Sequence, residues 1–203
     1  MLPVDPVIAG FAFASSTGLL FGLHDVCVRL ARLRSASSGV LLSLLAGYPL
    51  ILALAALLGG FEAVSLKALA FYVAAGVLNF SIGRVAMYIS ISRLGAGVAS
   101  ILISTSVVYN LVLGVALGED VGLGRALGSI LILAAVAVAS WGRGYGSTLD
   151  FVGVAGGLLA GLSIALSILL GRLGNIESGN PIAGVFIAYT SGLLAELTLV
   201  GLR

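Results

Sequence analysis

Long apolar segments recur along the whole chain and constrain its fold more than any other feature. A helix that crosses the hydrocarbon core of a bilayer needs about 20 mostly apolar residues. Charged residues fall mostly in the short connections between such segments. About seven segments reach or approach the required length: 7–30, 35–61, 68–91, 94–118, 126–142, 151–171 and 181–202. We therefore predict an all-α membrane protein with about seven transmembrane helices.

The composition argues against a soluble domain. Of the 203 residues, 60% are hydrophobic and only 9% are charged, whereas a soluble domain is typically about 25% charged. A soluble protein with so few charges lacks the solvated side chains that cover a surface, but lipid accepts apolar side chains on the outside of a protein. The net charge of +2 is too small to indicate a nucleic-acid partner. The expected environment is the lipid bilayer.

Glycines four residues apart occur in several of these segments. This spacing lets helix backbones approach closely within a membrane. We expect ordinary packing inside the bundle to explain these pairs, with a dimer contact on segment 94–118 as the alternative for one of them. The pairs and the triplet are Gly18/Gly22, Gly114/Gly118, Gly124/Gly128 and Gly153/Gly157/Gly161.

An internal repeat aligns the last two segments with the first two. A shift of 143 residues brings Arg29-Leu30 onto Arg172-Leu173 at equivalent helix ends. Matches among Leu, Ala and Gly carry less weight in so apolar a chain. The repeat unit then holds five spans, an odd number, so the second copy is inverted in the membrane. Many secondary transporters are built in this way.

Four short motifs share one resemblance. Phe21-Gly22 precedes the basic Arg29 in the first segment, 88–102 joins the third and fourth segments, and 111–119 ends in Gly118-Glu119. Residues 161–172 look like a second opening segment. Together these motifs resemble the EamA family of the drug/metabolite transporter superfamily. The chain departs from that family at Ser106, where a proline is usual, and in having fewer than ten spans.

The resemblance implies a first unit of five transmembrane helices at 1–148 and a partial second unit of two at 149–203. It implies a multi-pass transporter in the cell membrane that moves small metabolites by alternating access, with proton- or exchange-coupled export. Because the second unit is incomplete, we expect activity to require a homodimer or a further C-terminal segment. A truncated, inactive fragment and a receptor-like binding protein are the alternatives.

Polar groups inside the predicted spans are the candidate substrate-binding residues. A charged side chain in the middle of a span costs about 2.5–3.5 kcal/mol or more, so its presence there calls for a functional explanation. The candidates are His24, Asp25, Asn79, Arg84, Tyr109, Asn110, Tyr189 and Glu196.

The charged residues inside the spans also have structural explanations. Arg29 lies one helical turn from Asp25 and could simply neutralise it. Arg84 could hold an anionic substrate group, or its long side chain could reach the membrane interface. Glu196 could carry protons inside the span or lie at the interface near the end of the chain.

Three aromatic residues and one acid are assigned structural positions. Tyr72, Trp141 and Tyr145 fit the belt of aromatic side chains at the membrane–water interface. Glu119 carries the family match but falls in a predicted loop, where a structural role is expected.

The sequence does not indicate an enzyme, a metal site or another cofactor. Lys67 is the only lysine and falls in a short loop, so no lysine in the last span could form a retinal Schiff base. There is one histidine and one cysteine, without a Gly-x-Ser-x-Gly motif or clustered acidic residues. Nucleophilic catalysis needs an activated nucleophile beside a base, and this pattern offers none.

The depths of two charged residues in their spans predict one ion pair. The first and third spans run in the same direction, and Asp25 and Arg84 lie at similar distances from their starts, hence at similar depths. Because burying either charge alone is costly, we predict that the two side chains face each other with His24 beside them. The orientation is left open: the distribution of Lys and Arg favours an outward N-terminus, whereas the resemblance favours both ends inside.

Overall fold

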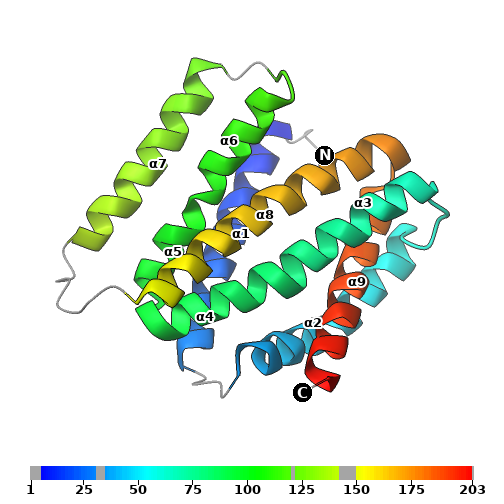
Figure 1. Cartoon of the computed structure of the whole chain (residues 1–203). Helices are drawn as coiled ribbons and strands as arrows, with labels where there is room; N and C mark the ends of the chain where they lie inside the picture. The colour runs from blue at the N-terminus through cyan, green and yellow to red at the C-terminus, as the bar shows by residue number, and fades with distance from the viewer. Residues whose placement is uncertain (1–5, 31–34, 120–121, 142–149, 203) are drawn as a thin grey trace.

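The structure is a computed structural model that describes residues 6–30, 35–119, 122–141 and 150–202. Helices make up nearly all of these ranges, and no strand occurs within them, which confirms the predicted all-α class (Figure 1). The elements in chain order are α1 (Pro6–Leu30), α2 (Ala36–Leu58), α3 (Leu66–Gly76), the π-helix η1 (Val77–Gly83), α4 (Arg84–Leu94), α5 (Ala96–Ser104), α6 (Ser106–Ala116), α7 (Leu123–Trp141), α8 (Phe151–Ser178) and α9 (Pro181–Gly201).

Six helical stretches of the described chain are long and apolar enough to cross a membrane. They are Gly10–Leu30, Ala36–Leu58, Leu66–Leu94, Ala96–Ala116, Phe151–Ser178 and Pro181–Gly201. The remaining predicted segment, 126–142, falls largely on α7, a helix of 19 residues. The architecture is that of a multi-pass membrane protein.

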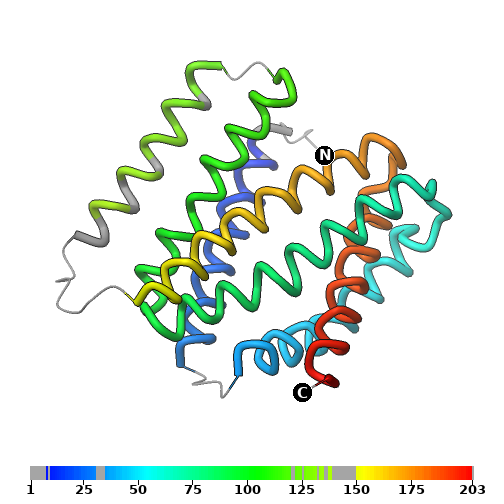
Figure 2. The backbone as a smooth tube through the Cα atoms, in the orientation of Figure 1, coloured from blue at the N-terminus to red at the C-terminus, as the bar shows by residue number. Residues whose placement is uncertain are grey.

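The third span is a single rod with an irregular middle. Helices α3 and α4 are continuous through η1, as the unbroken tube of Figure 2 shows. Within η1 each backbone N–H donates to the carbonyl five residues earlier, rather than four as in an α-helix. The backbone N–H of Arg84, for example, donates to the carbonyl of Asn79. Arg84 therefore lies within the span and does not end it. Such π-helical turns are rare and occur frequently at functional sites.

The fourth span begins and bends at identifiable residues. Gly95 has a φ of 81°, a left-handed conformation that favours glycine and separates α4 from α5. The helix is interrupted at Thr105, whose backbone N–H donates to the carbonyl of Leu102 at 3.2 Å. The interruption lies beside Ser106, the position where the sequence lacks the expected proline. A tight three-residue turn therefore breaks the span where a proline would otherwise bend it.

Helix α8 occupies the centre of the bundle. It packs against α3, η1 and α4 on one side and against α5 and α6 on the other. Small residues permit this approach: a Cβ at Gly157 would lie 2.5 Å from Leu102 Cβ, and one at Gly153 would lie 2.7 Å from Leu94 Cγ. Packing within the bundle thus explains the glycine triplet of α8. At Gly18 and Gly22 on α1, an added Cβ would meet no described neighbour within 4 Å.

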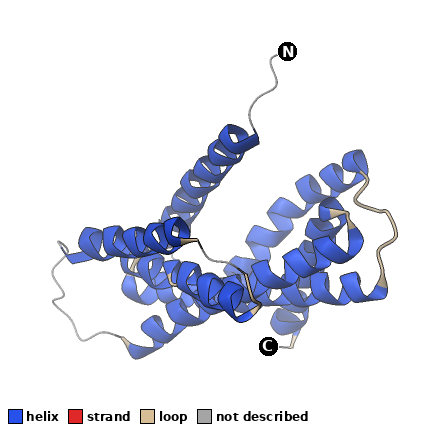
Figure 3. Cartoon of the chain, turned by 90° about the horizontal axis from the view of Figure 1, so that it is seen from above, coloured by secondary structure: helices blue, strands red, loops and turns tan. Residues whose placement is uncertain are grey.

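The peripheral helices differ in how firmly they are held. Helix α9 packs against α2, α3 and η1, and α7 packs against α5 and α6. Helix α1 contacts mainly α4 and α5, and most of its side chains are exposed. In Figure 3 the N-terminal half of the helix that follows the N label stands apart from the others. The attachment of α1 to the bundle therefore depends on a few contacts near its C-terminal end.

Tyr72 is not part of an interfacial aromatic belt. Its side chain is buried, and its hydroxyl lies 2.9 Å from Asn175 Oδ1, 2.6 Å from Ser178 Oγ and 3.2 Å from the carbonyl of Asn180. It ties α3 to the turn between α8 and α9, so the belt assignment is wrong for this residue. The side chain of Trp141 and all of Tyr145 lie outside the described residues.

An ion pair at the start of α8 gives a testable pH dependence. Arg93 donates to Asp150 at 2.6 Å, and Asp150 also accepts from the N–H groups of Val152 and Gly153 as the N-cap. The hydrogen bond from Arg93, followed by that from Gly153, holds the pKa of Asp150 below its usual range. Ionised Asp150 therefore stabilises the fold above the usual aspartate pKa, and this contribution is lost as the pH falls through the lowered pKa.

Asp150→Asn is expected to lower the melting temperature slightly at neutral pH, because asparagine retains a capping oxygen but loses the charge. The difference from the wild type should vanish in acid. Thermal unfolding in detergent at several pH values measures it. Asp150→Ala loses the cap as well and should destabilise the fold at every pH. A constant difference between Asp150→Asn and wild type would contradict the role of the ion pair.

Candidate functional site

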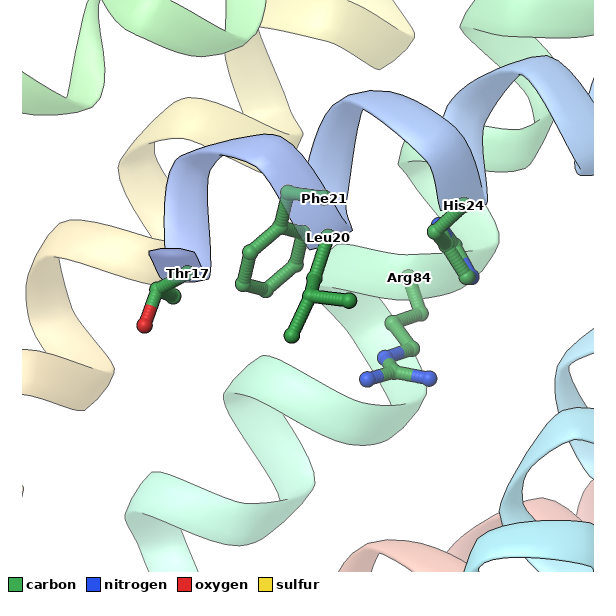
Figure 4. Close-up of a pocket in the computed structure, with 5 residues that line it drawn as sticks. All are labelled: Thr17, Leu20, Phe21, His24 and Arg84. Atoms are coloured by element: carbon green, nitrogen blue, oxygen red, sulfur yellow. The ribbon is translucent and has the colours of Figure 1, made fainter. Parts of the chain in front are cut away.

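An open pocket of about 250 Å³ lies between α1 and α4. Thr17, Leu20, Phe21 and His24 line it from α1, because residues spaced by three, four and seven positions share one face of a helix. Arg84, the first residue of α4, closes the other side (Figure 4). The pocket thus combines an apolar wall, Leu20 and Phe21, with two basic side chains.

His24 connects α1 to two other helices through a polar network. Its Nδ1 lies 3.3 Å from Asp25 Oδ1, and its Nε2 lies 3.1 Å from the hydroxyl of Tyr88 on α4. Ser100 on α5 donates to Asp25 Oδ2 at 3.4 Å. The Asp25 side chain is 13% exposed, and that of His24 is 27% exposed. These contacts hold the loosely packed α1 at the level of the pocket.

The predicted Asp25–Arg84 ion pair is wrong. Arg84 Nη1 instead donates to Ser43 Oγ on α2 at 3.4 Å, and the guanidinium lies 5.3 Å from the centre of the Phe80 ring. The ion pairs within the described residues are His24–Asp25, Lys67–Glu177, Arg93–Asp150 and Arg172–Glu119. Equal depth placed the two charges at one level of the membrane but did not fix the direction in which each helix presents its side chain.

Arg29 does not pair with Asp25 either. Its Nη1 donates to the carbonyl of Ile91 at 2.9 Å, at the last turn of α4. This bond is a further anchor of α1. The basic side chain next to Asp25 is therefore His24, whose position beside Asp25 was predicted.

Tyr189 lies in a separate aromatic cluster. It is buried on α9, its hydroxyl donates to the carbonyl of Leu44 at 3.1 Å, and its ring centre lies 4.8 Å from that of Phe80. Phe80 therefore contacts both the guanidinium of Arg84 and the ring of Tyr189. This places Tyr189 one residue away from the pocket rather than in its wall.

The other amide and phenol candidates lie away from the pocket. Asn79 is half-buried on η1, and Tyr109 and Asn110 are half-buried on α6. Asn110 Nδ2 donates to the carbonyl of Ser106 in its own helix, at 2.9 Å. The structure therefore brings His24 and Arg84 to one pocket, with Asp25 bonded to His24, but does not bring Asn79, Tyr109 and Asn110 there.

Several residues of the site were not singled out from the sequence. Thr17 lies seven positions before His24, which places both on one helix face, so the helical period alone would have found it. Tyr88 lies four positions after Arg84 and within the motif at 88–102. Ser100 also lies within that motif, whereas Ser43 carried no signal, because isolated serines are common in membrane helices.

Glu119 and Arg172 join the end of α6 to α8. Arg172 Nη2 donates to Glu119 Oε1 at 2.5 Å. The structural role expected for Glu119 agrees with this position, and Arg172 is one of the arginines matched by the internal repeat.

Glu196 is a second polar site, apart from the pocket. The side chain is fully buried on α9, and Ser81 Oγ on η1 donates to its Oε2 at 2.7 Å. No described residue provides a hydrogen-bond partner for Oε1. The carboxyl group lies inside the contact between α9 and η1 and is not exposed on the outside of the bundle.

The sequence model of the EamA-like transporter family matches residues 8–141 of the chain. The chain belongs to this family. No curated protein and no solved structure matches it significantly. As an EamA protein it is a multi-pass membrane transporter of small molecules, which sits in the lipid bilayer and binds a small-molecule substrate. Members of the family are generally not enzymes. The match includes both walls of the pocket, whereas Glu196 lies beyond it.

Proposed function

We propose that this EamA protein exports small organic anions across the cell membrane by alternating access, coupled to protons or to exchange. The observation that supports the proposal is Arg84. Its guanidinium lines the pocket, where it contacts a serine hydroxyl and an aromatic ring, and no carboxylate of the described residues lies within ion-pairing distance of it.

An arginine inside a span is costly unless its charge is compensated. Ser43 and Phe80 compensate it only in part, because a hydroxyl and a ring face carry no negative charge. A guanidinium offers five N–H donors in a fork that matches a carboxylate or a phosphate. The missing counter-charge is therefore best supplied by an anionic group of the substrate.

The rest of the pocket defines the substrate further. Leu20 and Phe21 would contact an apolar part of the molecule, and Thr17 and His24 would contact polar groups near its two ends. The volume of about 250 Å³ is below the usual range for drug-sized ligands, so it suits a small metabolite.

The mobile wall in this proposal is α1. It forms one side of the pocket, yet it is held mainly by the polar contacts of His24, Asp25 and Arg29 with α4 and α5. Exchange of those contacts would let α1 open and close the pocket. We also propose that 1–148 forms one unit, that 149–203 belongs to an inverted second unit, and that the protein acts as a homodimer.

Purified protein in liposomes tests the function. A panel of small carboxylic acids is offered, each beside its neutral amide of nearly the same shape. Saturable uptake of one or more acids, without uptake of the matched amides, is expected. Equal uptake of acid and amide would contradict selection by Arg84. Binding of an acid without any uptake would favour the receptor-like alternative over transport.

A further inference from the structure

Glu196 is the only acidic or basic residue of α9, and its carboxyl group is enclosed where α9 crosses η1. One oxygen accepts the hydrogen bond of Ser81, and the other has no partner among the described residues. The pocket does not include Glu196, so the transport site described above leaves this carboxyl group without a role.

No cation of the described residues compensates Glu196. Helices α2 and η1, which pack against α9, contain no Asp, Glu, Lys, Arg or His. On α3, Lys67 pairs with Glu177 of α8, and on α8, Arg172 pairs with Glu119. Arg84, which follows η1, donates to Ser43.

The tyrosines of these helices also have other partners. The hydroxyl of Tyr48 lies 3.4 Å from Thr190 Oγ1, and Tyr189 donates to Leu44. Tyr72 bonds to the turn between α8 and α9. Among the described residues that pack around α9, Ser81 is thus the one polar contact of Glu196.

An ionised carboxylate without a counter-charge is very unfavourable in such a place. Moving such an ion out of water into a low-dielectric interior is costly, and a group so placed generally takes up a proton instead. A protonated carboxyl group keeps an acceptor oxygen for the Ser81 hydroxyl and is uncharged. The packed arrangement of α9 on η1 therefore suits an uncharged carboxyl group.

The geometry points to Glu196 and Ser81 as a proton-binding site that controls the contact between α9 and η1. The proton is held on the carboxyl group while the helices are packed. It leaves to water when α9 separates from η1, because hydration then stabilises the carboxylate. The role of this proton in coupling rests on the transport function proposed above, whereas the protonation of the packed state does not.

Phe80 connects this site to the pocket. It is the residue before Ser81, its ring lies beneath the guanidinium of Arg84, and its Cβ packs directly against Gly192, one turn from Glu196 on α9. An anion that draws Arg84 toward the pocket and a proton that closes α9 on η1 therefore act on the same segment. A π-helical turn interrupts the regular hydrogen bonding of the α-helix on either side of it, so this segment can shift its hydrogen-bond register.

Infrared spectroscopy of the purified protein tests protonation without any substrate. The C=O stretching band of a protonated carboxylic acid is expected at neutral pH. It should be lost in Glu196→Gln, shifted in Ser81→Ala because the hydrogen bond to the C=O is removed, and retained in the control Glu177→Gln. Absence of the band in the wild type, or its retention in Glu196→Gln, would overturn the proposal. If Glu196→Gln fails to fold, the presence of the band in the wild type and its shift in Ser81→Ala still test whether Glu196 is protonated.

Coupling is tested separately in liposomes. Uptake of the transported acid is measured with and without an imposed pH gradient in the same preparation, and the stimulation by the gradient is the readout. Stimulation is expected for the wild type and for Glu177→Gln and should be lost in Glu196→Gln. Undiminished stimulation in Glu196→Gln would overturn the coupling role. If no acid is transported at all, the proposed function fails, while the infrared result stands by itself.

Discussion

A single methyl group added at position 76 is expected to disrupt the bundle strongly. Gly76 ends α3, and a Cβ there would overlap with the backbone carbonyl oxygen of Ala188 and with Ser191 Oγ, both on α9. A backbone atom cannot move aside unless its helix moves. Overpacking of this kind typically costs about 1–3 kcal/mol, occasionally more. Gly76→Ala should therefore lower the melting temperature in detergent markedly and reduce the yield of folded protein.

Gly171→Ala is the matched control. It makes the same chemical change inside α8, but an added Cβ at Gly171 would meet no described neighbour within 4 Å. Its melting temperature should equal or exceed that of the wild type, because alanine favours a helix over glycine by up to about 1 kcal/mol. Equal stability of the two variants would show that α9 does not pack on α3 through Gly76.

Arg84→Gln is expected to have the largest effect on transport. A hydrogen bond to a charged group contributes about 1.5–3 kcal/mol, and about 1.4 kcal/mol corresponds to a tenfold change in affinity. Loss of the guanidinium should therefore raise the acid concentration that gives half-maximal uptake by about 10- to 100-fold. Arg84→Lys should recover part of the affinity, because it restores the charge without the planar fork.

Arg172→Gln serves as the control for loss of one arginine. Arg172 lies on α8 away from the pocket and is paired with Glu119. Its half-maximal concentration should match that of the wild type. An unchanged value in Arg84→Gln, with a melting temperature that shows a folded protein, would mean that Arg84 does not contact the substrate.

The helices were predictable because hydropathy and length alone decide them. The third segment was predicted at 68–91 and is observed as Leu66–Leu94, with Arg84 inside it. Its π-helical middle was not predictable, since the hydrogen-bond register there depends on partners far away in sequence, such as the contact of Ser81 with Glu196. The turn at Thr105 likewise interrupts a predicted span at Ser104-Thr105-Ser106, a run without the glycine or proline that usually marks a break.

The site was predictable in its residues more than in its contacts. Charge within a span singled out His24, Asp25, Arg84 and Glu196, and all four lie in polar arrangements. Which residue faces which was not predictable, because depth follows from counting residues whereas direction follows from how each helix is turned. Glu196 shows the same limit: its burial arises from the packing of α9 on η1, which no local pattern encodes.

The π-helical turn also bears on how related transporters could keep one pocket while their third spans differ in length. A π-helical turn holds one residue more than an α-helical turn, whereas one residue in a regular α-helix corresponds to roughly 100° of rotation about the helix axis. A relative with one residue fewer in Val77–Gly83 could close this turn as a regular α-helix and still present Arg84 toward Thr17 and His24. The same loss within a regular α-helix would turn the arginine away from α1, so this turn is where the span can gain or lose a residue without a change in the chemistry of the pocket.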